Sequence, residues 1–122
     1  MDDRKRLIAE YKQEKKPAGV FMLRNTGNGK ILLGSSLNLQ GPLNRLRFEL
    51  SFGAHKCRAL QDDWNTLGPD MFTFEIVDSF LPKDDPAFDA SAELTVLEDL
   101  WLEKLQPFGE RGYNEERHIR QA

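Results

Sequence analysis

The chain has 122 residues, with 17 Lys or Arg and 20 Asp or Glu side chains, and its formal net charge is -3. This length suits one domain around one hydrophobic core, and a hydrophobic content of 39% excludes a disordered chain. The acidic balance argues against indiscriminate nucleic-acid binding, although a local basic face is compatible with it. A single cysteine, Cys57, excludes an intramolecular disulfide and a cysteine-based metal cluster.

Residues 1–17 predict an amino-terminal helix, which Asp2 or Asp3 caps and Pro17 ends. No apolar segment of the signal-peptide type follows the charged first residues. No apolar run reaches the roughly 20 residues that a membrane-spanning helix needs. We therefore expect a cytoplasmic protein that does not contact a membrane.

Two short apolar segments around a Gly/Asn turn predict a β-hairpin. The first segment is residues 18–24, the second is residues 30–34, and Asn-Thr-Gly-Asn-Gly lies between them. The apolar runs are nearly continuous instead of alternating. Other elements should therefore cover both faces of the hairpin, and helices packed on a sheet would do so.

A helical region follows the hairpin. Pro42 suits a first helical position, which predicts a helix from Pro42 to Phe52. Arg45 projects from the side opposite its apolar stripe, whereas Arg47 lies near the stripe's edge. The stripe consists of Leu43, Leu46 and Leu50.

A further helix and a strand come next. Residues 58–67 predict a helix that Gly68 ends. The side chains expected to face inward are Leu60, Trp64 and Leu67. Residues 71–80 alternate apolar and more polar side chains and predict a strand. The apolar set of that strand is Phe72, Phe74 and Ile76. Residues 81–89 contain two prolines and several acidic residues and predict a loop.

The last helix, residues 91–105, carries a carboxylate on its apolar face. That face consists of Leu94, Leu97, Trp101, Leu102 and Leu105. Glu98 lies on the same face, whereas Asp99 and Glu103 point toward water. A buried carboxylate requires a cation, a hydrogen-bond network or a metal. On this helix alone two interpretations stay open: a half-solvated charge paired with an arginine, or a functional ligand.

The order helix–strand–strand–helix–helix–strand–helix predicts an α/β domain in the mixed α+β sense. We expect a small three-stranded, mainly antiparallel central sheet flanked by helices. Residues 107–114 predict an extended, turn-rich segment, and residues 115–122 a flexible carboxy-terminal tail.

Several segments, taken in order, resemble the GIY-YIG nuclease superfamily. Gly19-Val20-Phe21 and Leu32-Leu33-Gly34 stand at the positions of its two named tripeptides. Residues 44–47 resemble its arginine-bearing helix, and residues 55–76 are similar to the middle of phage homing endonuclease domains. Residues 98–105, followed by Gly112-Tyr113-Asn114, resemble the catalytic helix and the closing asparagine motif. The resemblance extends to the amino-terminal domain of the excision-repair incision nuclease, and it implies a GIY-YIG nuclease-like domain over residues 18–114.

The resemblance implies roles for individual residues. Glu98 matches the carboxylate that holds one divalent ion, Mg²⁺ or Mn²⁺, at the scissile phosphate, and a hard oxygen ligand suits that ion. Arg45 matches the arginine that stabilises charge on this phosphate. Asn114 matches the asparagine that fixes the catalytic helix or its surroundings. The residues expected to bind the substrate are Arg47, Lys56 and Arg58.

The residues alone leave alternatives open at these positions. Helical geometry does not favour Arg45 over Arg47 as the arginine that faces the phosphate, and it is compatible with Arg45 as a plain surface charge. Asn114 is equally well explained as a turn residue after Gly112.

Two positions depart from the family pattern. Phe21 and Leu32 stand where the family has tyrosines, and neither side chain can donate, accept or lose a proton. Losing general-base help costs on the order of 10²–10⁴ in rate. An imidazole titrates near neutral pH, so His55 is a candidate replacement base; the alternative is a surface residue or a helix cap.

Two hypotheses follow for the function. The first is a metal-dependent endonuclease that hydrolyses DNA phosphodiester bonds, with activity weakened by the absence of both tyrosines. The second is a catalytically inactive module of the same fold that binds nucleic acid or a protein partner. Phe21, Leu32 and the acidic pI of about 5.4 motivate the second hypothesis.

Overall fold

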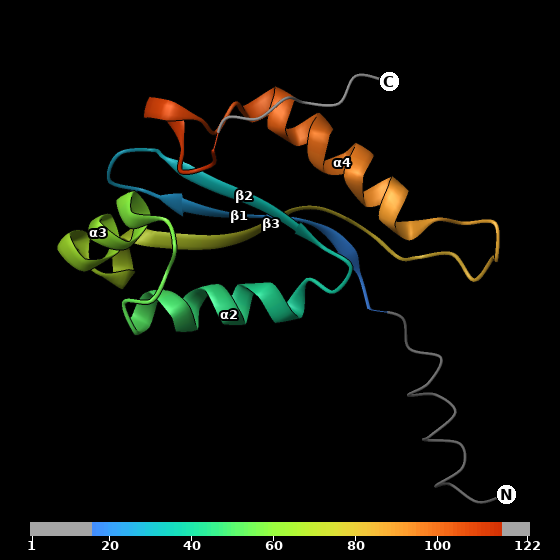
Figure 1. Cartoon of the computed structure of the whole chain (residues 1–122), viewed down its shortest axis with the longest axis horizontal. Coiled ribbons are helices and arrows are strands. Elements are labelled where there is room, and N and C mark those ends of the chain that lie inside the picture. Colours follow the sequence, from blue (N-terminus) through green and yellow to red (C-terminus); the bar gives the residue numbers. More distant parts are fainter. Residues whose placement is uncertain (1–15, 116–122) are drawn as a thin grey trace, which may run out of the picture.

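The computed structural model describes residues 16–115 (Figure 1). Most of the helix predicted for residues 1–17 and of the tail predicted for residues 115–122 lies outside the described residues. The strands are β1 (Ala18–Asn25), β2 (Ile31–Ser36) and β3 (Phe72–Phe80). The α-helices are α2 (Gln40–Ser51), α3 (Arg58–Leu67) and α4 (Ala90–Leu105), and short 3-10 turns occupy Pro69–Met71 and Gly109–Arg111. No helix in this described part is long and apolar enough to cross a membrane.

The three strands form one antiparallel sheet in the order β2-β1-β3. Strands β1 and β2 are a hairpin, as predicted, with Phe21 opposite Gly34 and Leu23 opposite Leu32. Backbone hydrogen bonds close the turn, because the N–H of Asn25 donates to Lys30 at 2.9 Å. The prediction of a small antiparallel sheet flanked by helices is confirmed.

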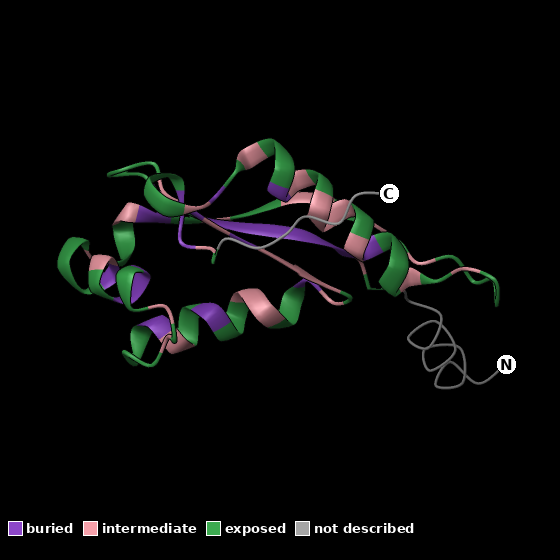
Figure 2. Cartoon of the chain, turned by 45° about the horizontal axis from the view of Figure 1, so that its top comes forward, coloured by how far each residue is buried: buried purple, intermediate pink, exposed green. Residues whose placement is uncertain are grey.

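Helices cover both faces of the sheet, as the continuous apolar strands predicted. Figure 1 shows α2 on one face and α4 on the other. Successive residues of β1 alternate between the two core clusters, and Figure 2 shows this strand as a buried band. The α2–α3 side includes Phe21, Leu23, Leu46, Leu50, Leu60 and Trp64, and the α4 side includes Val20, Met22, Ile31, Leu33 and Leu102. Full burial of one such side chain is worth about 1.5–3 kcal/mol.

The helix ends follow from local chemistry. Helix α2 begins at Gln40, two residues earlier than predicted, because the side chain of Asn38 accepts a hydrogen bond from the Gln40 N–H at 3.2 Å. Pro42 then lies in the first turn, where a missing N–H is tolerated. At the start of α4, Asp89 caps the helix by accepting a hydrogen bond from the Ala92 N–H at 3.1 Å. The bounds of α3 agree with the prediction, but Leu67 at its end is 41% exposed instead of inward.

A β-bulge changes the pattern of β3. Strand β1 pairs Phe21 with Ile76 and Val20 with Asp78, so Val77 is an extra residue. Val77 packs with the α4 cluster, whereas Ile76 is 54% exposed. Ile76 keeps the register of Phe72 and Phe74, so the expectation that it continues their buried face is wrong for another reason: β3 is an edge strand of the sheet.

The segment after α4 returns to β2. The N–H of Tyr113 donates to the carbonyl of Ile31 at 2.8 Å, and Gly112 forms a parallel bridge with the same residue. The extended, turn-rich segment that the sequence predicted therefore lies along the outer edge of β2. This arrangement places Asn114 beside Leu33.

Candidate functional site

Two adjoining hollows lie beside β2, and we call them together the β2 groove. The larger has a volume of about 640 Å³ and the smaller about 470 Å³. Three residues line both hollows: Leu32, His55 and Lys56. The larger also contacts Leu33, Cys57, Arg58, Glu98, Tyr113, Asn114 and Glu115, whereas the smaller contacts Phe21, Pro42, Arg45, Leu46, Glu49 and Ala54. Segments far apart in the sequence thus meet at one edge of the sheet.

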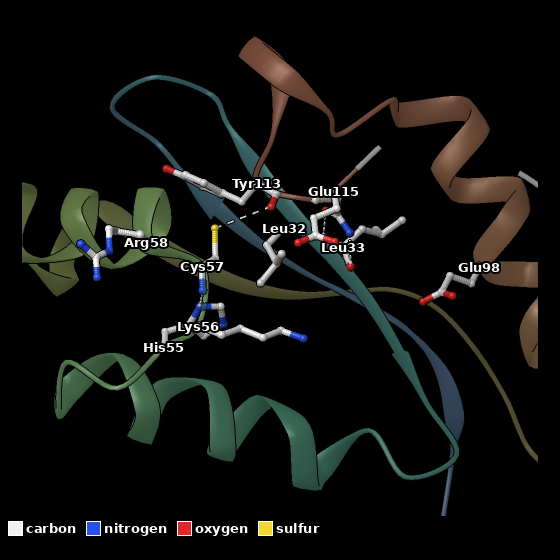
Figure 3. A pocket seen from close by; sticks show the side chains of 10 residues that line it. Leu32, Leu33, His55, Lys56, Cys57, Arg58, Glu98, Tyr113 and Glu115 are labelled. Carbon is white, nitrogen blue, oxygen red and sulfur yellow. Dashed lines mark hydrogen bonds between the residues drawn. The ribbon is translucent and has the colours of Figure 1, made fainter. Parts of the chain in front are cut away.

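Glu98 comes from α4 and lines the larger hollow. Its side chain is half-buried, and Figure 3 shows its carboxylate directed toward the same open side as the Lys56 side chain. Glu103 is exposed as predicted, whereas Asp99 is partly buried. The position of Glu98 at the edge of the apolar face therefore agrees with the helical periodicity.

Arg45 and Arg47 lie in different surroundings. Arg45 lines the smaller hollow, with its side chain 81% exposed and its Nε 3.0 Å from Glu49 on the next turn of α2. The Arg47 guanidinium lies over the ring of Phe74 on β3, 4.4 Å from the ring centroid. Arg47 lines neither hollow of the β2 groove. Of these two arginines, the structure brings Arg45 to the groove.

Lys56 and Arg58 add positive charge at the start of α3. Within residues 16–115, neither has a carboxylate within 4.0 Å. Figure 3 shows the Lys56 side chain extending toward the Glu98 side, whereas Arg58 points away from Glu98. Both cations line the larger hollow together with the carboxylates Glu98 and Glu115. A cation beside a concave surface attracts anions, so Lys56 and Arg58 can hold a phosphate there.

His55 is held by its neighbours. Its backbone N–H donates to the side chain of Gln61 at 3.1 Å, and its Nδ1 accepts a hydrogen bond from the Cys57 N–H at 3.0 Å. Burial lowers the pKa of His55 below 6.5, although the Glu49 charge opposes this shift. The imidazole is therefore neutral at pH 7, and its proton resides on Nε2 because Nδ1 is an acceptor. In this state Nε2 is a hydrogen-bond donor.

Two solved structures resemble this chain. A mutant of the catalytic domain of the intron endonuclease I-TevI matches with a TM-score of 0.64 and 22% identity, over 80% of this chain and 92% of that domain. The catalytic domain of the homing endonuclease I-TevI matches with a TM-score of 0.63 and 24% identity, over 82% and 99%. No protein-family model and no curated protein sequence matches the chain.

The chain has the GIY-YIG nuclease fold. The likeness covers about four fifths of the chain, at a sequence identity that establishes the architecture alone. A shared fold does not fix the chemistry, which depends on the residues of the groove.

The two segments that resemble the family's tripeptides lie on β1 and β2, and they give the groove an apolar floor. Phe21 is 8% exposed and lines the smaller hollow, whereas Leu32 is partly buried and lines both hollows. The Phe21 ring lies against Gly34, where an added Cβ would be 2.4 Å from the ring's Cζ. Gly34 is thus needed for close packing, and neither Phe21 nor Leu32 presents a titratable group to the groove.

Asn114 fixes the wall of the groove. Its Oδ1 accepts a hydrogen bond from the Leu33 N–H, and its Nδ2 donates one to the Leu33 carbonyl, each at 2.8 Å. The asparagine thus contacts β2, and through this strand it fixes the carboxy-terminal segment. This geometry explains why an amide is useful here beyond a role in a turn.

Tyr113 is a groove residue to which the sequence pattern assigned no role. Its hydroxyl donates to Asp63 at 2.6 Å and accepts a hydrogen bond from Asn25 at 3.0 Å. Burial and the hydrogen bond to Asp63 raise the pKa of Tyr113 to about 12. Figure 3 shows its ring pointing away from Glu98, so its hydroxyl does not face that carboxylate. The sequence feature that could have identified Tyr113 is its position next to Asn114 in an extended segment.

The possible ligands of a metal are few. Within residues 16–115, no group of three or more His, Cys, Asp or Glu side chains is arranged to hold a metal ion. Mg²⁺ does not require such a cage, because it commonly takes one or two carboxylates together with water and substrate phosphate. The larger hollow holds two carboxylates, half-buried Glu98 and exposed Glu115, beside the cations Lys56 and Arg58, and this set fits one such ion.

Proposed function

We propose that this protein binds DNA in the β2 groove and acts as a metal-dependent endonuclease with a low rate. The observation that carries the proposal is the joint presence of Glu98 and Lys56 in one hollow, with Arg45 in the adjoining hollow. A carboxylate and cations on one concave surface suit the binding of a phosphodiester and a divalent ion. Endonuclease catalytic domains with the same fold support this choice.

Glu98 is the residue that would hold the ion. Bound Mg²⁺ or Mn²⁺ supplies Lewis-acid polarisation of a phosphoryl oxygen and neutralises part of the phosphate charge. The carboxylate also repels a phosphate that approaches without a cation, since like charges at close range are unfavourable. DNA binding in the larger hollow should therefore strengthen when a divalent ion is present.

The remaining polar residues act on the phosphate. Arg45 offers a planar, permanently charged guanidinium once it exchanges its exposed pair with Glu49 for the phosphate, and such surface pairs are worth at most about 1 kcal/mol. Lys56 contributes a second positive charge. His55 offers a neutral N–H donor, because its Nδ1 is occupied by Cys57. Asn114 acts as a positioning residue through Leu33.

The proton transfer is the weak step. Hydrolysis requires the attacking water to lose a proton, and neither Phe21 nor Leu32 can accept it. Water or hydroxide from the solvent must then take part in place of a positioned side chain. We expect a rate lower by about 10²–10⁴ than a site with a positioned base would support.

A second candidate function is a binding module without catalysis. The apolar floor formed by Phe21 and Leu32 favours it, because a surface under selection only for binding has no need of a base. Its ligand would be nucleic acid or a protein partner. The two candidates predict different outcomes in one assay.

The assay is nicking of supercoiled plasmid with Mg²⁺ or Mn²⁺, comparing the wild type with Glu98→Gln and, as the matched control, Glu103→Gln. Glu103 lies on the same helix and is exposed. We expect nicking by the wild type and by Glu103→Gln, and loss of at least tenfold in Glu98→Gln. Equal nicking by all three proteins, or none, contradicts the endonuclease.

DNA affinity then separates the remaining possibilities. Without nicking, an affinity that falls steeply with salt indicates a nucleic-acid module, because phosphate contacts release counterions. If the protein neither nicks nor binds DNA, the remaining candidate is a module that binds a protein partner.

A further inference from the structure

Two aromatic rings lie exposed side by side on α2. Phe48 is 63% exposed and Phe52, which follows the last residue of the helix, is 73% exposed. Their ring centroids are 4.6 Å apart with an interplanar angle of 37°. Phenylalanine rings bury large apolar areas when they can, so a paired and exposed set indicates a surface that meets another molecule.

The pair lies next to the β2 groove. Phe48 follows Arg45 by three residues and Phe52 follows it by seven, which is about one and two helical turns. Residues at these spacings share one side of a helix. Figure 2 shows exposed positions recurring along the outer side of α2. After Phe52, three residues of chain lead to His55, which lines both hollows. The rings therefore adjoin the part of the groove that holds Arg45 and Lys56.

The surroundings of these rings point to a nucleobase. Elsewhere in the described part, α4 exposes Val96 and Leu100, which are aliphatic and line neither hollow of the groove. Phe48 and Phe52 instead offer flat faces beside cations that suit phosphate. An aromatic face next to positive charge is the combination that holds single-stranded nucleic acid, whose bases are free to stack. Bases of a duplex are already stacked on each other.

We propose that Phe48 and Phe52 form a stacking surface for unpaired bases of a DNA strand whose phosphates lie in the β2 groove. This inference rests on the proposed function and deepens it. The substrate would be DNA with a single-stranded stretch, such as a flap, a gap or a melted end. The strand runs from the phosphate contacts at Arg45 and Lys56 onto the outer side of α2.

The experiment measures binding of a 12-nucleotide oligothymidine and of a matched duplex by fluorescence anisotropy at several salt concentrations. The test variant is Phe48→Leu with Phe52→Leu, which keeps an apolar surface and removes the rings. The control variant is Val96→Ala with Leu100→Ala on α4. Because all four side chains are exposed, we expect every variant to unfold at about the wild-type temperature.

The wild type should bind the single strand more tightly than the duplex, and the Phe variant should bind it at least about fivefold more weakly for each base that no longer stacks. The slope of log affinity against log salt should not change, because no phosphate contact is lost. By contrast, Arg45→Gln should reduce that slope by about 0.7. A 2-aminopurine in the strand should be quenched by the wild type and remain bright with the Phe variant.

The outcomes separate this inference from the proposed function. If the wild type binds DNA and the Phe variant binds it equally well, the stacking surface is wrong and the groove proposal stands. If the wild type binds neither DNA, both fail. If the wild type self-associates and the Phe variant does not, with equal oligonucleotide affinity, the rings form a protein contact and the inference is overturned.

Discussion

The side-chain amide of Asn114 pairs with both polar backbone atoms of Leu33, at 2.8 Å for each hydrogen bond. The amide thus forms the pair of hydrogen bonds that a neighbouring strand's backbone would form at the outer edge of β2. The contact spans 81 residues of sequence and joins the end of the described chain to the middle of the hairpin. It therefore holds one wall of the groove at a fixed distance from its floor.

Replacing this amide should loosen the wall. Asn114→Ala leaves the N–H and carbonyl of Leu33 without their partners, and we expect a loss of about 1–3 kcal/mol in the free energy of unfolding. Urea unfolding followed by tryptophan fluorescence measures this change. Asn44→Ala, at an exposed position on α2, is the control and should stay within about 0.5 kcal/mol of the wild type. Equal stability of both variants would show that the Asn114 pairing contributes nothing.

Tyr113 should make stability depend on alkaline pH. Burial and the bond to Asp63 raise its pKa to about 12, whereas a tyrosine in the unfolded chain titrates near 10. Above pH 10 the unfolded state therefore binds fewer protons than the native state, and the free energy of unfolding falls as pH rises toward 12. Tyr113→Phe leaves the buried amide of Asn25 without the hydroxyl, so it should be less stable at pH 8 by about 1–3 kcal/mol.

The pH dependence of this stability difference tests the Tyr113–Asp63 contact. The stability difference between the wild type and Tyr113→Phe should be constant below pH 10 and shrink between pH 10 and 12. A difference that is independent of pH across this range contradicts the account of the Tyr113–Asp63 contact.

Local patterns predicted most of the fold. The Gly/Asn turn predicted the hairpin, and the predicted bounds of α3 agree with the structure. The face of α4 that carries Leu94 and Leu102 is buried as its periodicity indicated. The exposure of Ile76 was not foreseeable, because local alternation does not show that β3 lies at the edge of the sheet. The bulge at Val77 was not foreseeable either, because it depends on how β1 and β3 pair. The prediction that Leu67 faces inward was wrong. Helical spacing indicates the direction of a side chain, but it does not show whether the core extends to the end of the helix.

Alanine substitutions at Gly34 and Gly41 should have opposite effects on stability. A Cβ at Gly34 would lie 2.4 Å from the Phe21 ring, whereas one at Gly41 in the first turn of α2 meets nothing within 4 Å. We expect Gly34→Ala to destabilise by about 1–3 kcal/mol through displacement of that ring. Gly41→Ala should leave stability unchanged or raise it by up to about 1 kcal/mol. Thermal unfolding of both proteins decides this, and equal effects would argue against the Phe21–Gly34 packing.

Restoring the missing hydroxyls should increase cleavage. Phe21 and Leu32 both line the smaller hollow, so tyrosines at these positions would bring phenol groups toward it. If the groove binds the scissile phosphate, Phe21→Tyr with Leu32→Tyr should raise the nicking rate by about 10²–10⁴. The same double variant carrying Glu98→Gln should lose this gain. A rate that does not change on restoration would favour the binding module.

The candidate site was predictable only in outline. Glu98 was identified because a carboxylate interrupts an apolar stripe, and that signal is local. The choice between Arg45 and Arg47 could not be made from the sequence, since it depends on how α2 is rotated relative to β3. In the structure the Arg47 guanidinium packs on the ring of Phe74. Tyr113 was missed because its partners Asn25 and Asp63 lie 88 and 50 residues away. The tautomer of His55 likewise follows from a bond to Cys57 that no pattern in the sequence indicates.

The most direct measurement is diffraction from crystals soaked in Mn²⁺ and recorded near the manganese absorption edge. We predict one anomalous peak about 2.1 Å from a carboxylate oxygen of Glu98, on the side of the groove that Lys56 faces, and its disappearance in Glu98→Gln. An absence of any peak at Glu98, at Mn²⁺ concentrations that fully occupy a second protein used as a positive control, would contradict the assignment of a metal to this groove.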